Sequence, residues 1–173
     1  MDDIDVGPAW IALLVSGIIN TLYGLGYFGW SMFSLLFGGL AALGQINAIL
    51  DGHLQMSGIL FALVAALTPV LQVLAYGVIG IMGLVTIFGA VRLRTASSKG
   101  IVMLGIVCAI GAPVIGFAFT SLSLCNVGNC GACVFGFMFG NIGTIPAFVA
   151  GIIGSGWALA TIRDPAVAEA FAS

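Results

Sequence analysis

The chain has 173 residues, of which 61% are hydrophobic and only 6% are charged. Soluble domains carry roughly a quarter charged residues, so this composition and a mean hydropathy of +1.26 exclude an ordinary water-soluble domain. They also exclude a collagen, a disordered tail and a small secreted disulfide-rich protein. Four basic residues are too few to neutralise a phosphate track, so we expect no nucleic-acid partner. The composition predicts that the partner of most of the surface is the lipid bilayer.

The first uncharged stretch covers residues 6–50 and follows an acidic start. One membrane crossing takes about 20 apolar residues, so this stretch provides one crossing and a long remainder. Pro8 suits the first turn of a helix, which predicts a helix over about 8–30. Because a secretory signal peptide begins with basic residues, we expect this helix to be retained.

An apolar surplus over residues 29–65 follows the first predicted helix. One continuous helix over residues 8–43 would measure about 54 Å, against a hydrocarbon core of about 30 Å. Two interpretations stay open. The helix is broken near Gly24, Gly26 and Gly29 and the remainder is interfacial or re-entrant, or the helix protrudes and a partner or sister subunit covers it.

The remaining uncharged stretches, on either side of Arg92, Arg94 and Lys99, provide three more crossings. A cluster of Ser, Asn, Gly and Cys at 121–130 favours a turn and divides the longer stretch in two. We therefore predict further helices at about 66–92, 100–121 and 140–162. A six-crossing variant would add short spans at 30–44 and 58–67, but both are short for a bilayer.

The basic residues set the orientation. With four crossings, all of them fall on one face, which the positive-inside rule makes cytoplasmic. The predicted cytoplasmic anchors are Arg92, Arg94, Lys99 and Arg163. The sequence thus predicts an all-α integral membrane four-helix bundle, a single transmembrane domain over 1–173, in a bacterial inner membrane. Both termini are then cytoplasmic, whereas Asp51, His53 and the cysteine-bearing loop are extracytoplasmic.

Glycines recur at spacings that let helix backbones approach closely in lipid. The candidate helix-packing residues are Gly77, Gly80, Gly83, Gly136, Gly140, Gly151 and Gly154. Packing within one chain and packing between subunits both account for this pattern.

Polar residues within the predicted spans are uncharged. They are Asn20, Thr21, Gln72, Thr86 and Thr144. Hydrogen bonds between helices explain them, and the absence of ionisable side chains argues against a pump or an ion-coupled transporter. A passive pore lined by Asn and Thr is an alternative.

Cysteines give the main chemical lead. Cys125, Cys130 and Cys133 fall in the predicted outward loop, and Cys108 lies in the third helix. A structural disulfide from Cys125 to Cys130 or Cys133 suits an oxidising compartment. An iron–sulfur or other metal site lacks a fourth ligand in this loop, so we expect no metal.

The CxxC of Cys130 and Cys133 also permits redox chemistry. A four-helix membrane protein with a CxxC at its outer face resembles the quinone-linked thiol oxidases, which would make Cys130 and Cys133 the quinone-proximal pair. The chain departs from that family because only Cys125 is available for the second pair such enzymes use.

No other catalytic constellation is present in the sequence. His53 is the single histidine, and the sequence offers no catalytic triad or phosphate-binding loop. We expect no catalytic residue and no cofactor.

The second half of the chain, over about residues 54–171, has the order of glycine-rich helix, "GAVRLRTASSKGIVMLGI", a third helix with a cysteine-bearing loop, and "GIIGSGWALATIRDPAVAEAF". This order resembles uncharacterised small four-helix bacterial membrane proteins with a Cys-bearing loop between helices 3 and 4. The resemblance implies the topology and no activity.

The sequence favours a non-catalytic structural or accessory membrane subunit. We expect it to pack through glycine-rich helix faces against copies of itself or a larger membrane complex. A passive oligomeric channel is the first alternative, and a membrane thiol–disulfide oxidoreductase is the second.

Overall fold

The structure, a computed structural model, describes residues 6–50, 56–125 and 142–172, with side chains described for 6–37, 67–120 and 142–172. These residues are almost entirely helical and include no strand. The helices are α1 (Ala9–Leu50), α2 (Met56–Arg94), α3 (Lys99–Cys125), α5 (Thr144–Arg163) and α6 (Pro165–Ala170).

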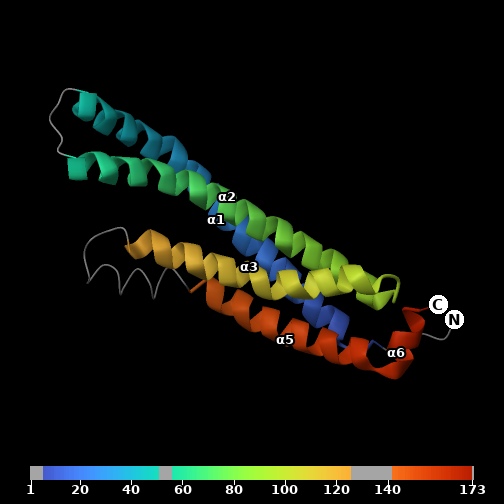
Figure 1. Cartoon of the computed structure of the whole chain (residues 1–173). Coiled ribbons are helices and arrows are strands. Elements are labelled where there is room, and N and C mark those ends of the chain that lie inside the picture. Colours follow the sequence, from blue (N-terminus) through green and yellow to red (C-terminus); the bar gives the residue numbers. More distant parts are fainter. Residues whose placement is uncertain (1–5, 51–55, 126–141, 173) are drawn as a thin grey trace.

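The four long helices form an up-and-down bundle (Figure 1). Helix α1 packs against α2 and α5, and α3 packs against the same two helices. The start of α1, the α2–α3 turn and the end of α5 therefore lie together at one end of the bundle (Figure 1). This end carries all the basic residues of the chain, as the four-pass prediction requires.

The interior of the bundle is built from small and medium-sized side chains. One cluster lies near the end that carries α6, and its fully buried members include Leu13, Leu93 and Val102. A second cluster brings together Tyr23 and Tyr76 with apolar neighbours. Buried alanines from α1, α2, α3 and α5 allow the helix backbones to approach closely.

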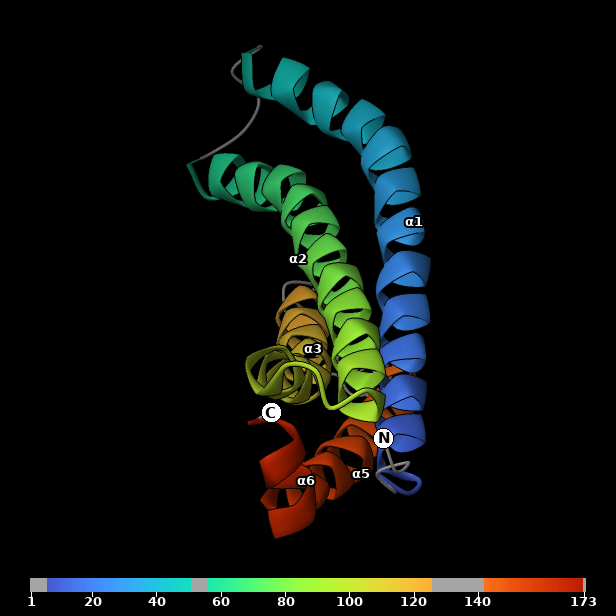
Figure 2. The same cartoon turned by 90° about the vertical axis from the view of Figure 1, so that its right-hand side faces the viewer.

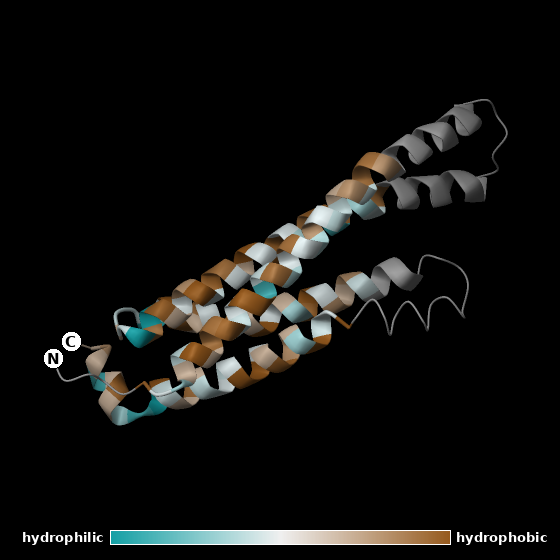
Figure 3. Ribbon diagram, turned by 180° about the vertical axis from the view of Figure 1, so that it is seen from behind, coloured by the Kyte–Doolittle hydropathy of each residue, from teal (hydrophilic) through white to brown (hydrophobic). Residues whose placement is uncertain are grey.

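The outside of the bundle is apolar along its length (Figure 3). Four helices are long and apolar enough to cross a membrane, over Ala9–Phe37, Leu67–Arg94, Lys99–Thr120 and Thr144–Arg163. Each exposes large aliphatic or aromatic side chains, such as Leu22, Ile81, Val107 and Ile145. For the part of the chain that the structure describes, the predictions of a helical fold without strands and of four helices of membrane-crossing length are confirmed.

The observed helix ends differ from the predicted ones in the first half of the chain. Helix α1 continues to Leu50, about 20 residues past the predicted end near residue 30, and α2 begins at Met56 rather than near residue 66. Helix α1 is therefore not broken near Gly24, Gly26 or Gly29, and Gly24 lies where the backbone of α1 meets that of α2. The two stretches proposed as extra short spans are continuations of α1 and α2.

Helices α1 and α2 are much longer than their two neighbours. Their 42 and 39 residues correspond to about 63 and 58 Å, against about 40 Å for the 27 residues of α3 and about 30 Å for the 20 residues of α5. Past the bundle the two helices continue as a separate pair (Figures 1 and 2). We call residues 31–50 of α1 and 56–73 of α2 the arm.

A short helix closes the opposite end. Asp164 caps α6, since its carboxylate accepts the amide of Ala166 at 3.0 Å, and Pro165 occupies the first helical position, where it needs no N–H partner. Val167 is buried, and Phe171 packs against the core cluster of Leu13 and Leu93. Helix α6 is therefore docked on the base of the bundle.

Candidate functional site

Several of the predicted packing glycines lie at contacts within the chain. A Cβ atom on Gly83 would collide with Thr21 of α1, one on Gly151 with the carbonyl oxygen of Ala109, and one on Gly154 would lie 2.8 Å from the carbonyl oxygen of Ala12. Gly77 and Gly80 face α1 with ordinary clearance, because their added Cβ atoms would stay 3.6 Å or more from the nearest side chain. Gly136 and Gly140 lie outside the described residues. The described glycine faces are thus used between helices of one chain.

The buried polar side chains also act within the chain. Asn20 Nδ2 of α1 donates to the carbonyl oxygen of Ala109 in α3 at 3.2 Å. The hydroxyl of Thr86 in α2 shares its one proton between the carbonyl oxygens of Met82, at 2.9 Å in its own helix, and Gly105 of α3, at 3.2 Å. Ser155 Oγ, which the sequence did not single out, donates to the carbonyl oxygen of Ile106 at 3.3 Å. Three helices are therefore joined to α3 by hydrogen bonds in the interior.

The other predicted polar residues do not form a lining on the outside. Thr144 is buried, Thr21 is partly buried and donates to the carbonyl oxygen of Gly17 at 2.8 Å, and Gln72 is of intermediate exposure. Asn20 and Thr86 are fully buried. A pore between copies of the chain would gain little polar lining from these positions.

Three tyrosines meet where the arm begins. Tyr27 of α1 stacks on Tyr76 of α2 with ring centroids 5.0 Å apart, and Tyr23 lies 4.9 Å from Tyr27 and edge-on to Tyr76 at 6.0 Å. Thr120 Oγ1 donates to the carbonyl oxygen of Gly116 at 2.8 Å, so Tyr76 Oη is the donor in its 3.0 Å bond to Thr120. The cluster joins α1, α2 and α3 at this level.

Tyr23 fits this cluster because two neighbouring positions are glycine. A Cβ atom on Gly116 would lie 2.8 Å from the Tyr23 ring and hydroxyl, and one on Gly143 would lie 3.3 Å from the ring. Its hydroxyl oxygen has no hydrogen-bond partner, and neither have Ser16 Oγ and Asn20 Oδ1 along the same face of α1. The described Asp, Glu, Lys and Arg side chains lie at the other end of the bundle, so Tyr23 has only the phenols of Tyr27 and Tyr76 as titratable neighbours among the described residues.

An aromatic strip follows on the outer side of α1, as the arm begins. Trp30 stacks against Phe33 with centroids 6.1 Å apart, and Phe33 lies 4.3 Å from Phe37. Trp30 is 68% exposed, and beside it a groove of about 460 Å³ runs over Leu22, Tyr23, Gly26, Tyr27 and Trp30. A Cβ atom on Gly26 or Gly29 would meet nothing within 4 Å, so this surface is open.

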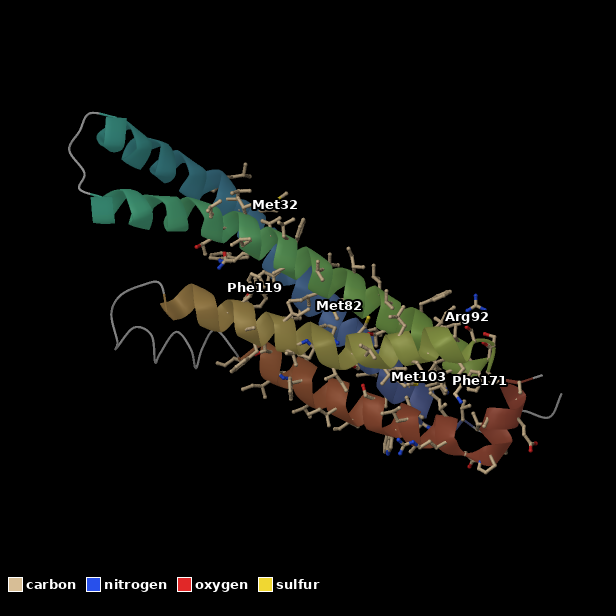
Figure 4. The ribbon with its side chains drawn as sticks, viewed as in Figure 1. Met32, Met82, Arg92, Met103, Phe119 and Phe171 are labelled. Carbon is tan, nitrogen blue, oxygen red and sulfur yellow. The ribbon has the colours of Figure 1, made fainter. Side chains whose placement is uncertain are left out.

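The described part of the arm exposes large apolar side chains on both helices. Leu36 is 71% exposed and Phe37 59%, and Leu67 and Leu71 of α2 are each half exposed. Met32 marks the start of this region in Figure 4, on the side of the bundle away from Arg92. The arm therefore presents an apolar surface beyond the level at which α3 and α5 meet the tyrosine cluster.

The predicted basic anchors surround the other end of the bundle. The Arg94 guanidinium lies over the ring of Trp10 in α1, 4.8 Å from its centroid, and that of Arg92 lies 4.9 Å from the centroid of Phe88. Lys99 begins α3 and Arg163 ends α5. Cation–π contacts of this kind contribute about 0.5–1 kcal/mol at exposed sites, so Arg94 also fastens α2 to the start of α1.

The structure describes two of the four cysteines to which the predictions refer. Cys108 is free and buried in α3, and Cys125 is the last residue of α3. Cys130 and Cys133, like Asp51 and His53, lie outside the described residues, so the predicted disulfide and the CxxC stay predictions. Within the described ranges, no three His, Cys, Asp or Glu residues gather to hold a metal ion.

Sequence reasoning did not identify the tyrosine cluster or the aromatic strip. The spacing of Tyr23 and Tyr27 places them on one helix face, which is a visible signal. Their meeting with Tyr76 depends on the register between α1 and α2, which a single sequence does not specify. The sequence does show the apolar surplus over residues 29–65. In the structure, its described residues belong to α1 and α2.

Comparisons with known proteins add no relative. The chain matches no protein-family model, no curated protein and no solved structure. A proposal for its function therefore rests on the bundle, its basic end and the arm.

Proposed function

We propose that the chain is a non-catalytic structural or accessory subunit of a membrane assembly, and that the arm is its contact surface. The bundle would cross a bacterial inner membrane with both termini in the cytoplasm. The arm would then extend on the extracytoplasmic side and pack against a partner subunit or a second copy of the chain.

The lengths of the helices support this placement. Twenty residues separate Trp10 from Trp30, which gives about 30 Å along α1, the thickness of a hydrocarbon core. Tryptophan favours both membrane–water interfaces. Trp10, with Arg94 beside it, would mark the cytoplasmic interface. Helix α5 covers the same distance with its 20 residues. A bilayer around the bundle therefore leaves the arm outside.

The observation that carries the proposal is the apolar surface of the arm. Its sequence contains no charged residue, and Phe33, Leu36 and Phe37 are each more than half exposed. Burial of one such side chain stabilises by about 1.5–3 kcal/mol relative to water. If nothing covered it, the described part of the arm would be an exposed apolar patch, which marks an interaction site.

The glycine-rich faces expected to carry contacts between subunits are largely occupied inside the chain. The proposal therefore assigns the contact to the arm. The described residues favour neither alternative function, since Asn20 and Thr86 are buried within one chain and the CxxC lies outside the described ranges.

Native mass spectrometry in a mild detergent tests this function. We expect the wild-type chain as an oligomer or with a bound partner, and expect the F33A/L36A/F37A variant as a free monomer. A matched control, I145A/V149A/I152A, removes three exposed apolar side chains of α5 and should leave the assembly intact. A monomeric wild type without a partner would contradict the proposal, as would equal assembly of the two variants.

A further inference from the structure

We propose that the turn between α2 and α3 binds the phosphate group of an anionic phospholipid through Arg92 and Lys99. The inference uses the membrane placement given above. It is independent of the arm, because the turn lies at the other end of the bundle (Figure 4).

Arg92 is held in place by its neighbours rather than free in water. Its guanidinium lies over the Phe88 ring at 4.9 Å, and its Nη1 donates to Ser97 Oγ at 3.2 Å. Ser97 Oγ in turn lies 2.8 Å from Thr95 Oγ1. A guanidinium carries five N–H donors, so this one bond to Ser97 leaves the rest of the fork for an anion. Ser97 is a positioning residue for Arg92.

The turn carries a net positive charge, and no acidic residue lies near it in the sequence. Residues 91–103 contain three basic residues and no acidic one. Arg94 lies over Trp10, so it sits beside α1, whereas Lys99 is exposed. The described carboxylates, Asp164 and Glu169, belong to the segment around α6, and that of Asp164 accepts the Ala166 amide.

The level of the turn fits a lipid head group rather than a dissolved anion. In the membrane placement proposed above, the turn between Arg94 and Lys99 lies at the cytoplasmic edge of the hydrocarbon core. Trp10, next to Arg94, belongs to a residue type enriched at the head-group level. Each Lys or Arg close to an anionic leaflet strengthens the binding of the protein to anionic lipid by about fivefold.

The test is native mass spectrometry of the delipidated full-length chain, titrated with phosphatidylglycerol and separately with phosphatidylcholine. We expect tighter binding of phosphatidylglycerol, weakened about fivefold by K99Q and about 25-fold by R92Q/K99Q. The S97A variant keeps the charge, and we expect it to weaken phosphatidylglycerol binding about twofold to fivefold while leaving phosphatidylcholine unchanged. All these positions lie at the surface turn, and an unchanged melting temperature verifies the fold of each variant.

The matched control is R163Q, which removes one basic charge from the same end of the bundle but from α5. It should change phosphatidylglycerol binding by less than about twofold. Equal binding of the two lipids would overturn the proposal. So would an effect of R163Q as large as that of K99Q, or displacement of the lipid by millimolar inorganic phosphate.

Discussion

At the residue scale, single glycines decide how closely α1 and α2 approach. Gly24 is one of the tight positions, since an added Cβ atom would lie 2.6 Å from the Cα atom of Gly80. Gly26, two positions further along the same helix, has no atom within 4 Å of such a Cβ. In lipid, helix association depends on close packing and on hydrogen bonds rather than on the exclusion of water. The two glycines therefore have opposite consequences when replaced.

The pair G24A and G26A tests this contrast. We expect G24A to lower the free energy of unfolding by about 1–3 kcal/mol, because the added methyl group must push α1 and α2 apart. We expect G26A to be neutral or to stabilise by up to about 1 kcal/mol, because alanine is the better helix former. Thermal unfolding in detergent measures both. Equal destabilisation of the two variants would show that the α1–α2 contact is not where the structure has it.

The sequence predicts that glycines pack helices together, but the face that each glycine occupies could not be predicted. Gly83 and Gly154 lie at positions where a Cβ does not fit, whereas Gly77 and Gly80 leave room for one. That difference depends on the register between helices. The same register brings Tyr76 to Tyr27, which is why the tyrosine cluster was not foreseen.

At the element scale, hydropathy predicts where helices form better than where they end. Helix α5 ends at Arg163, one residue from the predicted position, because Asp164 and Pro165 follow it. Helix α1 has no comparable stop signal near residue 30, and it continues to Leu50. The boundary of the bilayer would fall within α1 at Trp30, where the sequence marks the interface without ending the helix.

The depth of Trp30 tests this boundary. In the W10F/W157F variant, Trp30 is the only tryptophan, and it is 68% exposed. In proteoliposomes we expect its fluorescence to be quenched most strongly by lipids brominated close to the head group. The W30F/W157F variant, which keeps Trp10, should give the same depth from the opposite leaflet. Strongest quenching of Trp30 by bromines near the chain ends would place α1 about half a bilayer away from the position proposed here.

At the scale of the whole molecule, the two ends of the bundle differ in chemistry. One end carries Arg92, Arg94, Lys99 and Arg163, with α6 docked beneath it. The other end continues into the uncharged arm, about 30 Å long on the α1 side. A positive end at the cytoplasmic face and an apolar arm on the other side fit a subunit that is oriented by its charges and assembled by its arm. The central claim is that the arm stands outside the bilayer.

The height of residue 50 above the membrane tests that claim most directly. Cys108, Cys125, Cys130 and Cys133 are first replaced by alanine, so that L50C, at the end of α1, carries the only thiol for the fluorophore. The height of the label is measured by energy transfer to acceptors on the lipid head groups of the same proteoliposome. Because the arm bends away from the axis of the bundle (Figure 2), we expect residue 50 well above the head groups but at less than the full arm length of about 30 Å. We expect a label at A172C close to the opposite surface. A label at residue 50 that lies at the membrane surface would contradict the account, because the arm would then lie in or along the bilayer.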